Sequence, residues 1–381
     1  MDFNLTEEQQ LLIKSFKEML DREVPESYVS ECDRNHQPLE KFYEALVKHG
    51  YNMLGVEEKY GGTPVDYVTL MLLYMESAAR GIPDAPNQCL QVRDIMEFGN
   101  PEQQAAILDF VKKTGKTPFA LGITEPGAGS DDAGMVCQAK KMPDGTVVFN
   151  GQKTFITSAL TSPYIMLMTR DLEAPDPHKA VSMWLVPLNL PGFTVKKLDK
   201  ISWWTGNTCE VWLENVVAPQ SCLMGKEGEG FFQLMKNFEM ERLVVCASAA
   251  GAAKCAFEDA ARYATKRVQF GQPIGMFQQV QLKLTEMYTK VENMYNMVLK
   301  TAWKFDHGMP VDLDTALCKR YCAMASMEVC DEALQIYGGT GLLTDCRVSR
   351  LWRDARIMRI GGGTDEIMVN IVGRRLFKMY K

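Results

Sequence analysis

The chain contains 381 residues, of which 46% are hydrophobic and 24% are charged, proportions that are typical of a folded globular protein and exclude general disorder. At roughly 150 residues per domain, this length predicts two to three domains. The formal net charge is −6, which argues against nucleic acid as the main partner, because a nucleic-acid-binding surface needs clustered positive charge.

The sequence predicts no membrane partner and a location in the cytoplasm. It has no run of about 18 apolar residues, and its start, MDFNLTEEQQ, lacks the basic and apolar regions of a signal peptide. The 11 cysteines are scattered without a CxxC pair, which is typical of reduced thiols. Cys318 and Cys322 share a helical face with no histidine beside them, so we interpret them as packing residues and expect no metal site.

Residues 1–118 are predicted to form a helical domain. Thr6 and Gln9 match the capping-box pattern, and apolar residues then recur at helical spacing. A second helix is expected over residues 40–47, closed by Gly50. A more continuous apolar helix is expected over residues 68–79, which indicates that this helix is largely buried.

Residues 119–230 are predicted to form a compact antiparallel β domain, either a barrel or a sandwich. Short β-rich runs alternate here with turn residues, and Pro143-Asp144-Gly145 is typical of a hairpin turn. The expected strands include residues 147–150, 154–157, 164–169, 181–186 and 209–213.

Residues 231–381 are predicted to form a helical bundle of four helices. Long amphipathic patterns cover residues 231–270, 278–305 and 314–337. A bundle of this kind often buries a wide face against another subunit. The expected fold class is therefore α+β, with a helical, a β and a second helical domain in that order.

Several glycine-containing segments carry candidate binding residues. No GxGxxG follows a predicted strand and no GxxxxGKS/T occurs, so Rossmann and P-loop sites lose their main support. Residues 123–131 read ITEPGAGSD, where glycines let backbone amides approach a ligand and Thr124 and Ser130 supply hydroxyls. A tight structural loop is the alternative interpretation. Residues 361–366 read GGGTDE and lead into a final helix, where backbone N–H groups and Thr364 can hold a phosphate; a helix cap or turn is the alternative interpretation.

Together, and in this order, the segments resemble the acyl-CoA dehydrogenase family of flavoproteins. The resemblance covers essentially the whole chain, through ITEPGAGSD (123–131), GQKTFIT (151–157), RVQFG (267–271), QIYGGTG (335–341) and GGGTDE (361–366). The stretches TGKTPFALGITEPGAGSD and CAFEDAARYATKRVQFG are similar to the crotonobetainyl-CoA reductase branch of this family.

The resemblance implies an FAD held between the β domain and the C-terminal bundle. The residues that it places along the flavin are Thr124, Gly129, Ser130, Phe155, Ile156 and Thr157. Those implied at the adenine and diphosphate end of a neighbouring subunit's FAD are Arg267, Phe270, Gln335, Gly338 and Gly339, with Thr364 and Glu366 at the diphosphate and ribose. The resemblance therefore also implies a homotetramer.

Chemistry on an acyl thioester needs a carboxylate to move the proton at Cα while a hydride passes between Cβ and the flavin. The commonest family pattern places a Glu where this chain has Gly362, whereas a minority pattern matches Glu241-Arg242. Spacing alone puts Glu241 on an apolar helical stripe and leaves a structural ion pair as the alternative. The resemblance favours Glu241 as the base, and implies that the substrate contacts are Ser130, Phe238, Arg242 and Gly362.

The function predicted in this way is the interconversion of a short acyl-CoA and its 2,3-enoyl-CoA, with an electron-transferring flavoprotein as redox partner. The direction can be reduction, as in crotonobetainyl-CoA reductase. An FAD-retaining lyase or desulfinase-type relative is one alternative, against which the retained Glu241 argues. A non-catalytic CoA-binding homologue is another, against which the retained FAD segments argue. Trp203 and Trp204 either line the acyl end of the site or pack against other parts of the protein.

Overall fold

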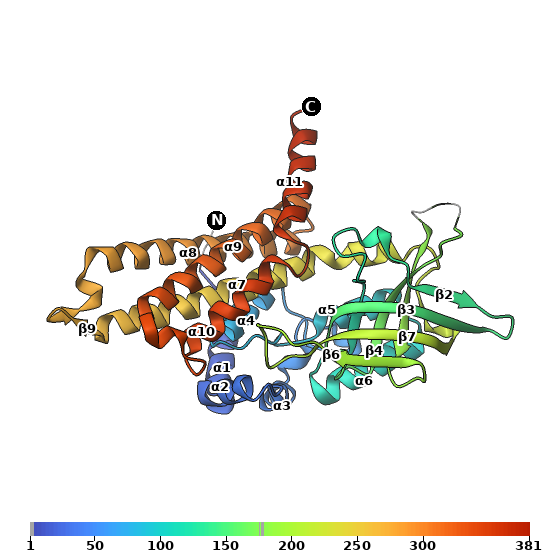
Figure 1. Ribbon diagram of the computed structural model, residues 1–381, viewed down its shortest axis with the longest axis horizontal. Coiled ribbons are helices and arrows are strands. Elements are labelled where there is room, and N and C mark those ends of the chain that lie inside the picture. Colours follow the sequence, from blue (N-terminus) through green and yellow to red (C-terminus); the bar gives the residue numbers. More distant parts are fainter. Residues whose placement is uncertain (1–3, 175, 177–178) are drawn as a thin grey trace.

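The computed structural model describes residues 4–174, 176 and 179–381. Figure 1 shows an elongated molecule, with the sheets of the middle part at one end and a long helical arm reaching the other. The N-terminal helices pack along one side, and the last helix projects from the body. The α+β class, with its helical, β and helical parts, is confirmed.

The N-terminal part is helical, as predicted. Thr6 accepts a hydrogen bond from the Gln9 backbone and the Gln9 side chain returns one, so the capping box is confirmed. Gly50 ends its helix with φ 75°, the left-handed conformation that favours glycine. The α-helices here are α1 (Glu7–Glu23), α2 (Glu26–Arg34), α3 (Glu40–His49), α4 (Tyr67–Ala78), α5 (Cys89–Phe98) and α6 (Pro101–Thr114), with 3-10 helices η1 (Tyr51–Met53) and η2 (Glu58–Tyr60).

The middle part is a sandwich of two sheets, with strand orders β1-β4-β5-β8 and β2-β3-β7-β6. Apolar side chains from both sheets, such as Phe149 and Trp184, form its core, and the two rings meet edge to face at 5.3 Å. The elements are β1 (Phe119–Gly122), η3 (Asp132–Gly134), β2 (Gln138–Lys141), β3 (Thr146–Thr157), β4 (Tyr164–Arg170), β5 (Val181–Pro187), β6 (Phe193–Lys197), β7 (Thr208–Pro219), η5 (Gln220–Cys222) and β8 (Leu223–Met224).

The β domain differs from the prediction in two respects. It is not wholly antiparallel, because β1 runs parallel to β4, with Phe119 opposite Tyr164. The chain leaves β1, forms the β2–β3 hairpin in the other sheet and only then returns, and such a crossover aligns the two strands. The runs 147–150 and 154–157 form one strand, β3, because two irregularities in its pairing with β7 bend the strand without ending it.

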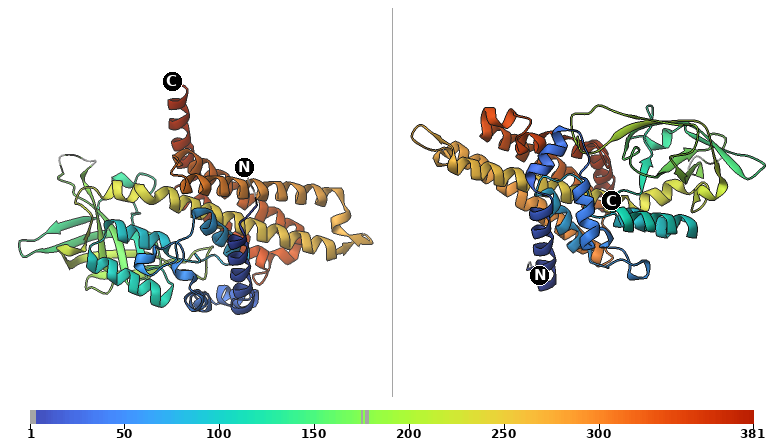
Figure 2. Two further views of the ribbon diagram at one scale, coloured as in Figure 1. Left: turned by 180° about the vertical axis from the view of Figure 1, so that it is seen from behind. Right: turned by 90° about the horizontal axis from the view of Figure 1, so that it is seen from below.

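The C-terminal part is a helical bundle around the 37-residue helix α7. Figure 2 shows α8 and α9 running along α7, and α11 standing away from them. The elements are α7 (Gly230–Lys266), β9 (Val268–Gln269), β10 (Gln272–Pro273), η6 (Ile274–Met276), α8 (Gln278–Asp306), α9 (Asp312–Tyr337), η7 (Gly338–Leu342), α10 (Arg347–Ala355), η8 (Arg356–Arg359) and α11 (Asp365–Met379).

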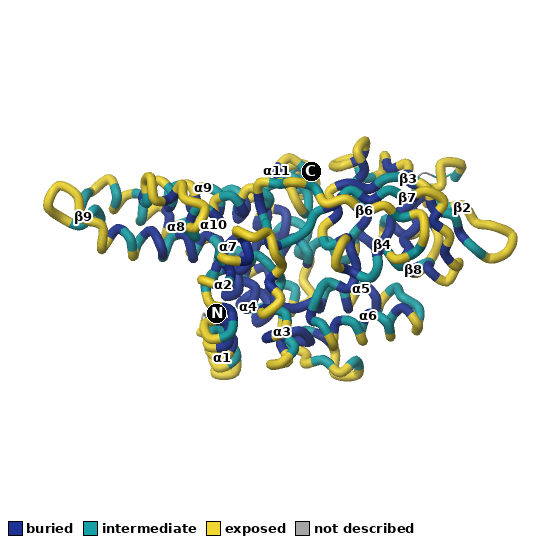
Figure 3. Tube along the Cα trace, turned by 60° about the horizontal axis from the view of Figure 1, so that its bottom comes forward, coloured by how far each residue is buried: buried dark blue, intermediate teal, exposed yellow. Residues whose placement is uncertain are grey.

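Helix α7 joins the three parts of the molecule. At its start, a Cβ on Gly230 would lie 2.8 Å from the Met183 nitrogen of β5, so glycine allows the β domain to approach closely. Further along, a Cβ on Gly251 would lie 2.1 Å from the Met75 carbonyl oxygen of α4. In Figure 3 the middle of α7 is buried, whereas the arm that ends at β9 has an exposed tip. None of the described helices combines the length and apolar character that a membrane span requires.

Candidate functional site

The candidate base Glu241 lies on α7, where it is half-buried. Among the described residues its carboxyl forms neither an ion pair nor a hydrogen bond, so the structural ion pair considered from the sequence is not formed. Burial raises the pKa of Glu241, and the neighbouring charge of Arg242 opposes this rise only in part. A carboxyl with these properties is suited to accept and return a proton.

Arg242, the next residue on α7, is only 7% exposed and holds another part of the site in place. Its guanidinium donates a hydrogen bond of 3.3 Å to the Gly362 carbonyl and lies 4.8 Å from the centre of the Phe238 ring. Lys319, fully buried on α9, donates to the Gly363 carbonyl at 2.6 Å. The glycine run 361–363 is therefore fixed between α7 and α9.

Gly362 itself has φ 67°, a left-handed conformation that favours glycine. A Cβ built on it would lie 3.8 Å from Val245 Cγ2, an ordinary van der Waals contact. Val245 lies one helical turn after Glu241, so a side chain at position 362 would approach the face of α7 that carries the base. Gly362 therefore leaves open space beside this face of α7.

The loop 123–131 is fastened to β3 by an ion pair that the sequence analysis missed. Lys153, fully buried in β3, lies 2.7 Å from the Glu125 carboxylate and also donates to the Ile123 carbonyl. Glu125 further accepts hydrogen bonds from the Val136 and Cys137 backbones. A signal for this pair exists in the sequence, because each of the two candidate ligand-binding segments contains a charged residue. The sequence does not show which charged residues meet.

This fastening leaves the ligand-facing groups of the loop free. Gly129 and Ser130 are exposed, Thr124 is half-buried, and a Cβ on Gly127 or Gly129 would find no atom within 4 Å. Asp132, just beyond the loop, is close enough to Arg242 for the guanidinium to oppose the rise in its pKa that burial causes. Asp132 thus lies within electrostatic range of Arg242 on α7.

At the end of β3 the three candidate residues face different ways. Phe155 has φ 59° and is 67% exposed, and Thr157 is exposed as well. Ile156 is 1% exposed and packs in the core of the sandwich, so its side chain supports the sheet and only its backbone can meet a ligand. The irregular pairing at this point turns Phe155 outward.

A second group of candidate residues lies far from Glu241 within the same chain. Arg267 follows Glu241 by 26 residues along α7, which at about 1.5 Å per residue is about 39 Å. Phe270 is 94% exposed, and Arg267 and Gln335 are exposed as well.

The glycines of this group lie at the same end of the arm. Tyr337, directly before Gly338, stacks on Tyr263 near the end of α7, with ring centres 4.3 Å apart. A Cβ on Gly338 or Gly339 would find no atom within 4 Å. The structure thus brings Arg267, Phe270, Gln335 and these glycines together, but not with Glu241.

Thr364 and Glu366 lie at the start of α11, directly after the glycine run. The Thr364 hydroxyl accepts a hydrogen bond of 3.3 Å from the Ile367 backbone and so caps the helix. Glu366 is exposed, and hydrogen bonds from its own backbone and from Thr364 lower its pKa. Both residues are next to Gly363 and hence near the Arg242 end of the site.

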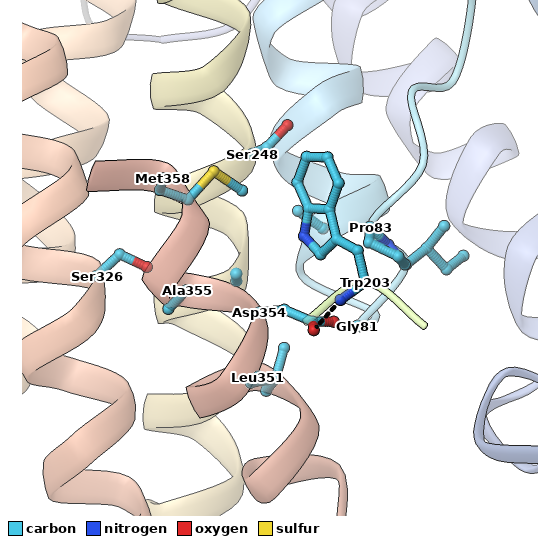
Figure 4. A pocket seen from close by; sticks show the side chains of 12 residues that line it. Gly81, Pro83, Trp203, Ser248, Ser326, Leu351, Asp354, Ala355 and Met358 are labelled. Carbon is cyan, nitrogen blue, oxygen red and sulfur yellow. Dashed lines mark hydrogen bonds between the residues drawn. The ribbon is translucent and has the colours of Figure 1, made fainter. Parts of the chain in front are cut away.

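The two tryptophans of the loop 201–207 have different surroundings. Trp204 stacks on His36 at 4.6 Å, and the Arg353 guanidinium lies 3.5 Å from the centre of its ring, so it packs between domains. Trp203 enters a small pocket whose lining includes Pro83, Ser248 and Met358 (Figure 4). Its backbone donates to Asp354, whereas its buried ring nitrogen has no partner.

Asp94 and Asn237, beside the candidate base, were also missed from the sequence. Asn237, one turn before Glu241 on α7, donates a hydrogen bond of 2.5 Å to Asp94 on α5, while its own Oδ1 is buried without a partner. Burial, assisted by the charge of Glu241, raises the pKa of Asp94 to about 7, although the bond from Asn237 opposes the rise. No sequence motif links α5 to α7, so only the packing of these helices shows the pair.

A third cysteine joins Cys318 and Cys322 in a group of three thiols close enough to hold a metal ion, so their packing role stays a prediction. Their sulfurs lie 3.7 Å apart, and Cys246 of α7 joins them so that all three sulfurs are within 4.8 Å of one another. The three side chains are at most 1% exposed. The cluster occupies the interface of α7 and α9, on the inner side of the glycine run that Lys319 holds.

Comparisons with known proteins cover the whole chain. Family models match the N-terminal domain (residues 6–112), middle domain (120–216) and C-terminal domain (228–377) of acyl-CoA dehydrogenase. The probable acyl-CoA dehydrogenase YdiO of Escherichia coli is 47% identical over 100% of both chains.

Solved structures agree. Butyryl-CoA dehydrogenase from Megasphaera elsdenii is 32% identical with a TM-score of 0.91, over 99% of this chain and 100% of that chain. A chain in a structure of the electron transferring flavoprotein of Acidaminococcus fermentans is 29% identical with a TM-score of 0.91, over 99% of each chain.

Proposed function

Because the chain belongs to the acyl-CoA dehydrogenase family, whose members depend on FAD, we propose that it interconverts a short acyl-CoA and its 2,3-enoyl-CoA. The observation that carries this proposal is the Glu241 carboxyl, half-buried and without a partner among the described residues. It lies on the helix that the loop 123–131 and the glycine run 361–363 both approach.

In this proposal Glu241 removes the proton from Cα of an acyl-CoA, or delivers it to Cα of an enoyl-CoA. Its raised pKa brings its proton affinity closer to what transfer near neutral pH requires. Arg242 keeps Gly362 against α7, and Gly362 leaves room for the thioester beside the base. Ser130 offers an exposed hydroxyl to the substrate, and Phe238 supports Arg242 through its ring.

The residues present fit an FAD. Bound FAD would exchange the hydride with Cβ of the substrate. Exposed Phe155 offers a ring surface, Thr157 and Ser130 offer hydroxyls, and the open backbone at Gly127 and Gly129 allows close approach. At the far end of α7, Phe270 likewise offers an exposed ring, and the open backbone at Gly338 and Gly339 likewise allows close approach.

The separation of these two groups supports a shared cofactor site. About 39 Å of helix divides Glu241 from Arg267, too far for one FAD to touch both within one chain. The arm of one subunit would therefore complete the FAD site of a neighbour, with Thr364 and Glu366 contributing at the base of α11. A homotetramer with shared sites is the assembly that we propose.

The proposed direction is reduction of the enoyl-CoA, supported by the similarity of residues 114–131 and 255–271 to the crotonobetainyl-CoA reductase branch. An electron-transferring flavoprotein is the proposed electron partner, supported by the structural neighbour from Acidaminococcus fermentans.

Anaerobic titration of the purified holoprotein tests the proposal. Saturated acyl-CoA thioesters should bleach the oxidised flavin, and enoyl-CoA thioesters should reoxidise the reduced flavin. A holoprotein whose flavin responds to neither class would contradict the function. A higher rate of flavin reduction than of reoxidation would contradict the proposed direction alone.

A further inference from the structure

We propose that Asp94 and Asn237 form a subsite that selects acyl groups carrying a hydrogen-bond donor, such as a hydroxyl, on Cγ or the next carbon. The inference rests on the proposed function, because it places the reacting Cα at Glu241. It concerns the end of the acyl group that points away from the thioester.

The subsite follows from the packing of α5 on α7. Asn237 and Glu241 are four residues apart, so they lie on one face of α7 about 5–6 Å apart at their Cβ atoms. Asp94 of α5 is fixed against this face by the bond of 2.5 Å that Asn237 donates. A substituent on Cγ of a substrate whose Cα meets Glu241 is within reach of Asn237 and Asp94.

This contact between α5 and α7 contains a hydrogen-bond acceptor that has no donor. The Asn237 amide donates one of its two hydrogens to Asp94, and Asn237 Oδ1 is buried without a partner. Among the described residues, the carboxyls of Asp94 and Glu241 form no ion pair. A buried acceptor without a donor costs free energy. A ligand that donates a hydrogen bond to this acceptor removes that cost and should bind more tightly.

The neighbouring cationic side chains form their hydrogen bonds and ion pairs with groups other than Asp94 and Glu241. Arg93 of α5 donates to the Tyr67 hydroxyl at 2.5 Å, and Arg242 donates to the Gly362 carbonyl. Lys236 pairs with Glu97 at the edge of the same helix contact.

The burial of the proposed subsite and the pKa of Asp94 are compatible with ligand binding. Asp94, Asn237 and Glu241 are each half-buried, so part of each residue remains accessible to a ligand. At neutral pH a proton is easily exchanged at Asp94, because burial raises its pKa to about 7. Asp94 therefore accepts a hydrogen bond when ionised, and its preference for a donor should strengthen as the pH rises above about 7.

Binding to the oxidised holoenzyme tests the inference without turnover. The probes are crotonyl-CoA, 4-hydroxycrotonyl-CoA and 4-trimethylammoniocrotonyl-CoA, the last of which has a positive charge but no N–H donor. Titration calorimetry should give a Kd for 4-hydroxycrotonyl-CoA at least about tenfold below that for crotonyl-CoA. Asp94→Leu should remove this preference, so that the Kd values of 4-hydroxycrotonyl-CoA and crotonyl-CoA for this variant lie within about threefold of each other. Glu97→Gln, which removes an acid from the same helix, is the matched control and should keep the preference.

Three results would overturn the inference. Equal affinity of the unchanged protein for crotonyl-CoA and 4-hydroxycrotonyl-CoA would show that no donor is selected. Persistence of the preference in Asp94→Leu would place the selection elsewhere. Tightest binding of the trimethylammonio compound, lost in Asp94→Asn, would show that charge is recognised instead of a donor. Failure to bind any of the thioesters would instead contradict the proposed function, so the two failures are distinguishable.

Discussion

The two ends of α7 carry different kinds of binding surface. Around Glu241 the chain supplies its own support, through Arg242 on Gly362, Lys319 on Gly363 and Asn237 on Asp94. Around Arg267 the candidate residues Arg267, Phe270 and Gln335 are exposed. The first end is organised within one subunit, whereas the second needs a ligand or a neighbour to cover it.

In the proposed function, this difference separates two tasks along one helix. Proton transfer needs a carboxyl held in a fixed and partly dry position, which the packing of α5, α7 and α9 provides. Holding an extended cofactor across subunits needs an exposed surface before assembly. The four predictions below test this division by changing residues at one end of α7 and measuring flavin reduction, FAD affinity or stability.

The largest effect is expected for Glu241→Gln at the supported end. Glutamine keeps the size of the side chain but cannot accept the proton, so flavin reduction by acyl-CoA should fall by at least about 10²-fold. Anaerobic stopped-flow absorbance measures this rate. Because the carboxyl has no partner among the described residues, FAD content and the melting temperature should change little. Near-normal flavin reduction would remove Glu241 from the chemistry.

A smaller effect is expected for Phe270→Ala at the exposed end. The ring is 94% exposed, so folding should be unaffected, while the affinity for FAD should fall by about tenfold through the loss of a buried ring contact in the assembly. Fluorescence titration of the apoprotein with FAD measures the change. Phe232→Ala is the matched control, because Phe232 is 61% exposed on α7 near the β domain. Equal losses in the two variants would contradict a cofactor role for the arm.

A carboxylate placed at position 362 should raise the rate of flavin reduction by less than tenfold over that of Glu241→Gln alone. In Glu241→Gln with Gly362→Glu, the new side chain has room, since its Cβ would meet only Val245 at 3.8 Å. The φ of 67° costs about 1–2 kcal/mol for a residue with a side chain, so recovery should be incomplete. Stopped-flow flavin reduction in both variants measures it. No recovery in a double variant that folds and binds FAD would show that the two positions do not serve the same Cα.

The smallest effect concerns the pH dependence of stability. Burial raises the pKa of Asp94 from 3.8 to about 7, and the nearby charges are those of Glu241, Arg93 and Glu97. The folded chain therefore holds the Asp94 proton more tightly than the unfolded chain. The contribution of Asp94 to the free energy of unfolding is fully present below about pH 4 and is lost as the pH rises through about 7. Asp94→Asn should reduce the fall in melting temperature between pH 5 and pH 8 by about 1–3 °C. An unchanged fall, measured by calorimetry, would contradict the raised pKa.

The sequence by itself determined the order of the domains and most of the helices. Local rules sufficed for these, because the capping box at Thr6, the left-handed Gly50 and the turn at Gly145 depend on residues only a few positions apart. The family motifs also identified Glu241 and the candidate cofactor segments. Membership of the acyl-CoA dehydrogenase family, and hence FAD, agrees with that resemblance.

Only the tertiary structure decided which of these residues meet. The Glu125–Lys153 pair and the Asp94–Asn237 bond join segments separated by 28 and 143 positions, and no periodicity in the sequence encodes such contacts. The parallel pairing of β1 with β4 depends on a crossover, and the burial of Ile156 beside the exposed Phe155 depends on an irregular strand pairing. The division of the candidate site between the two ends of α7 has the same origin, because the length of a straight helix, and not the order of motifs, sets the distance between them.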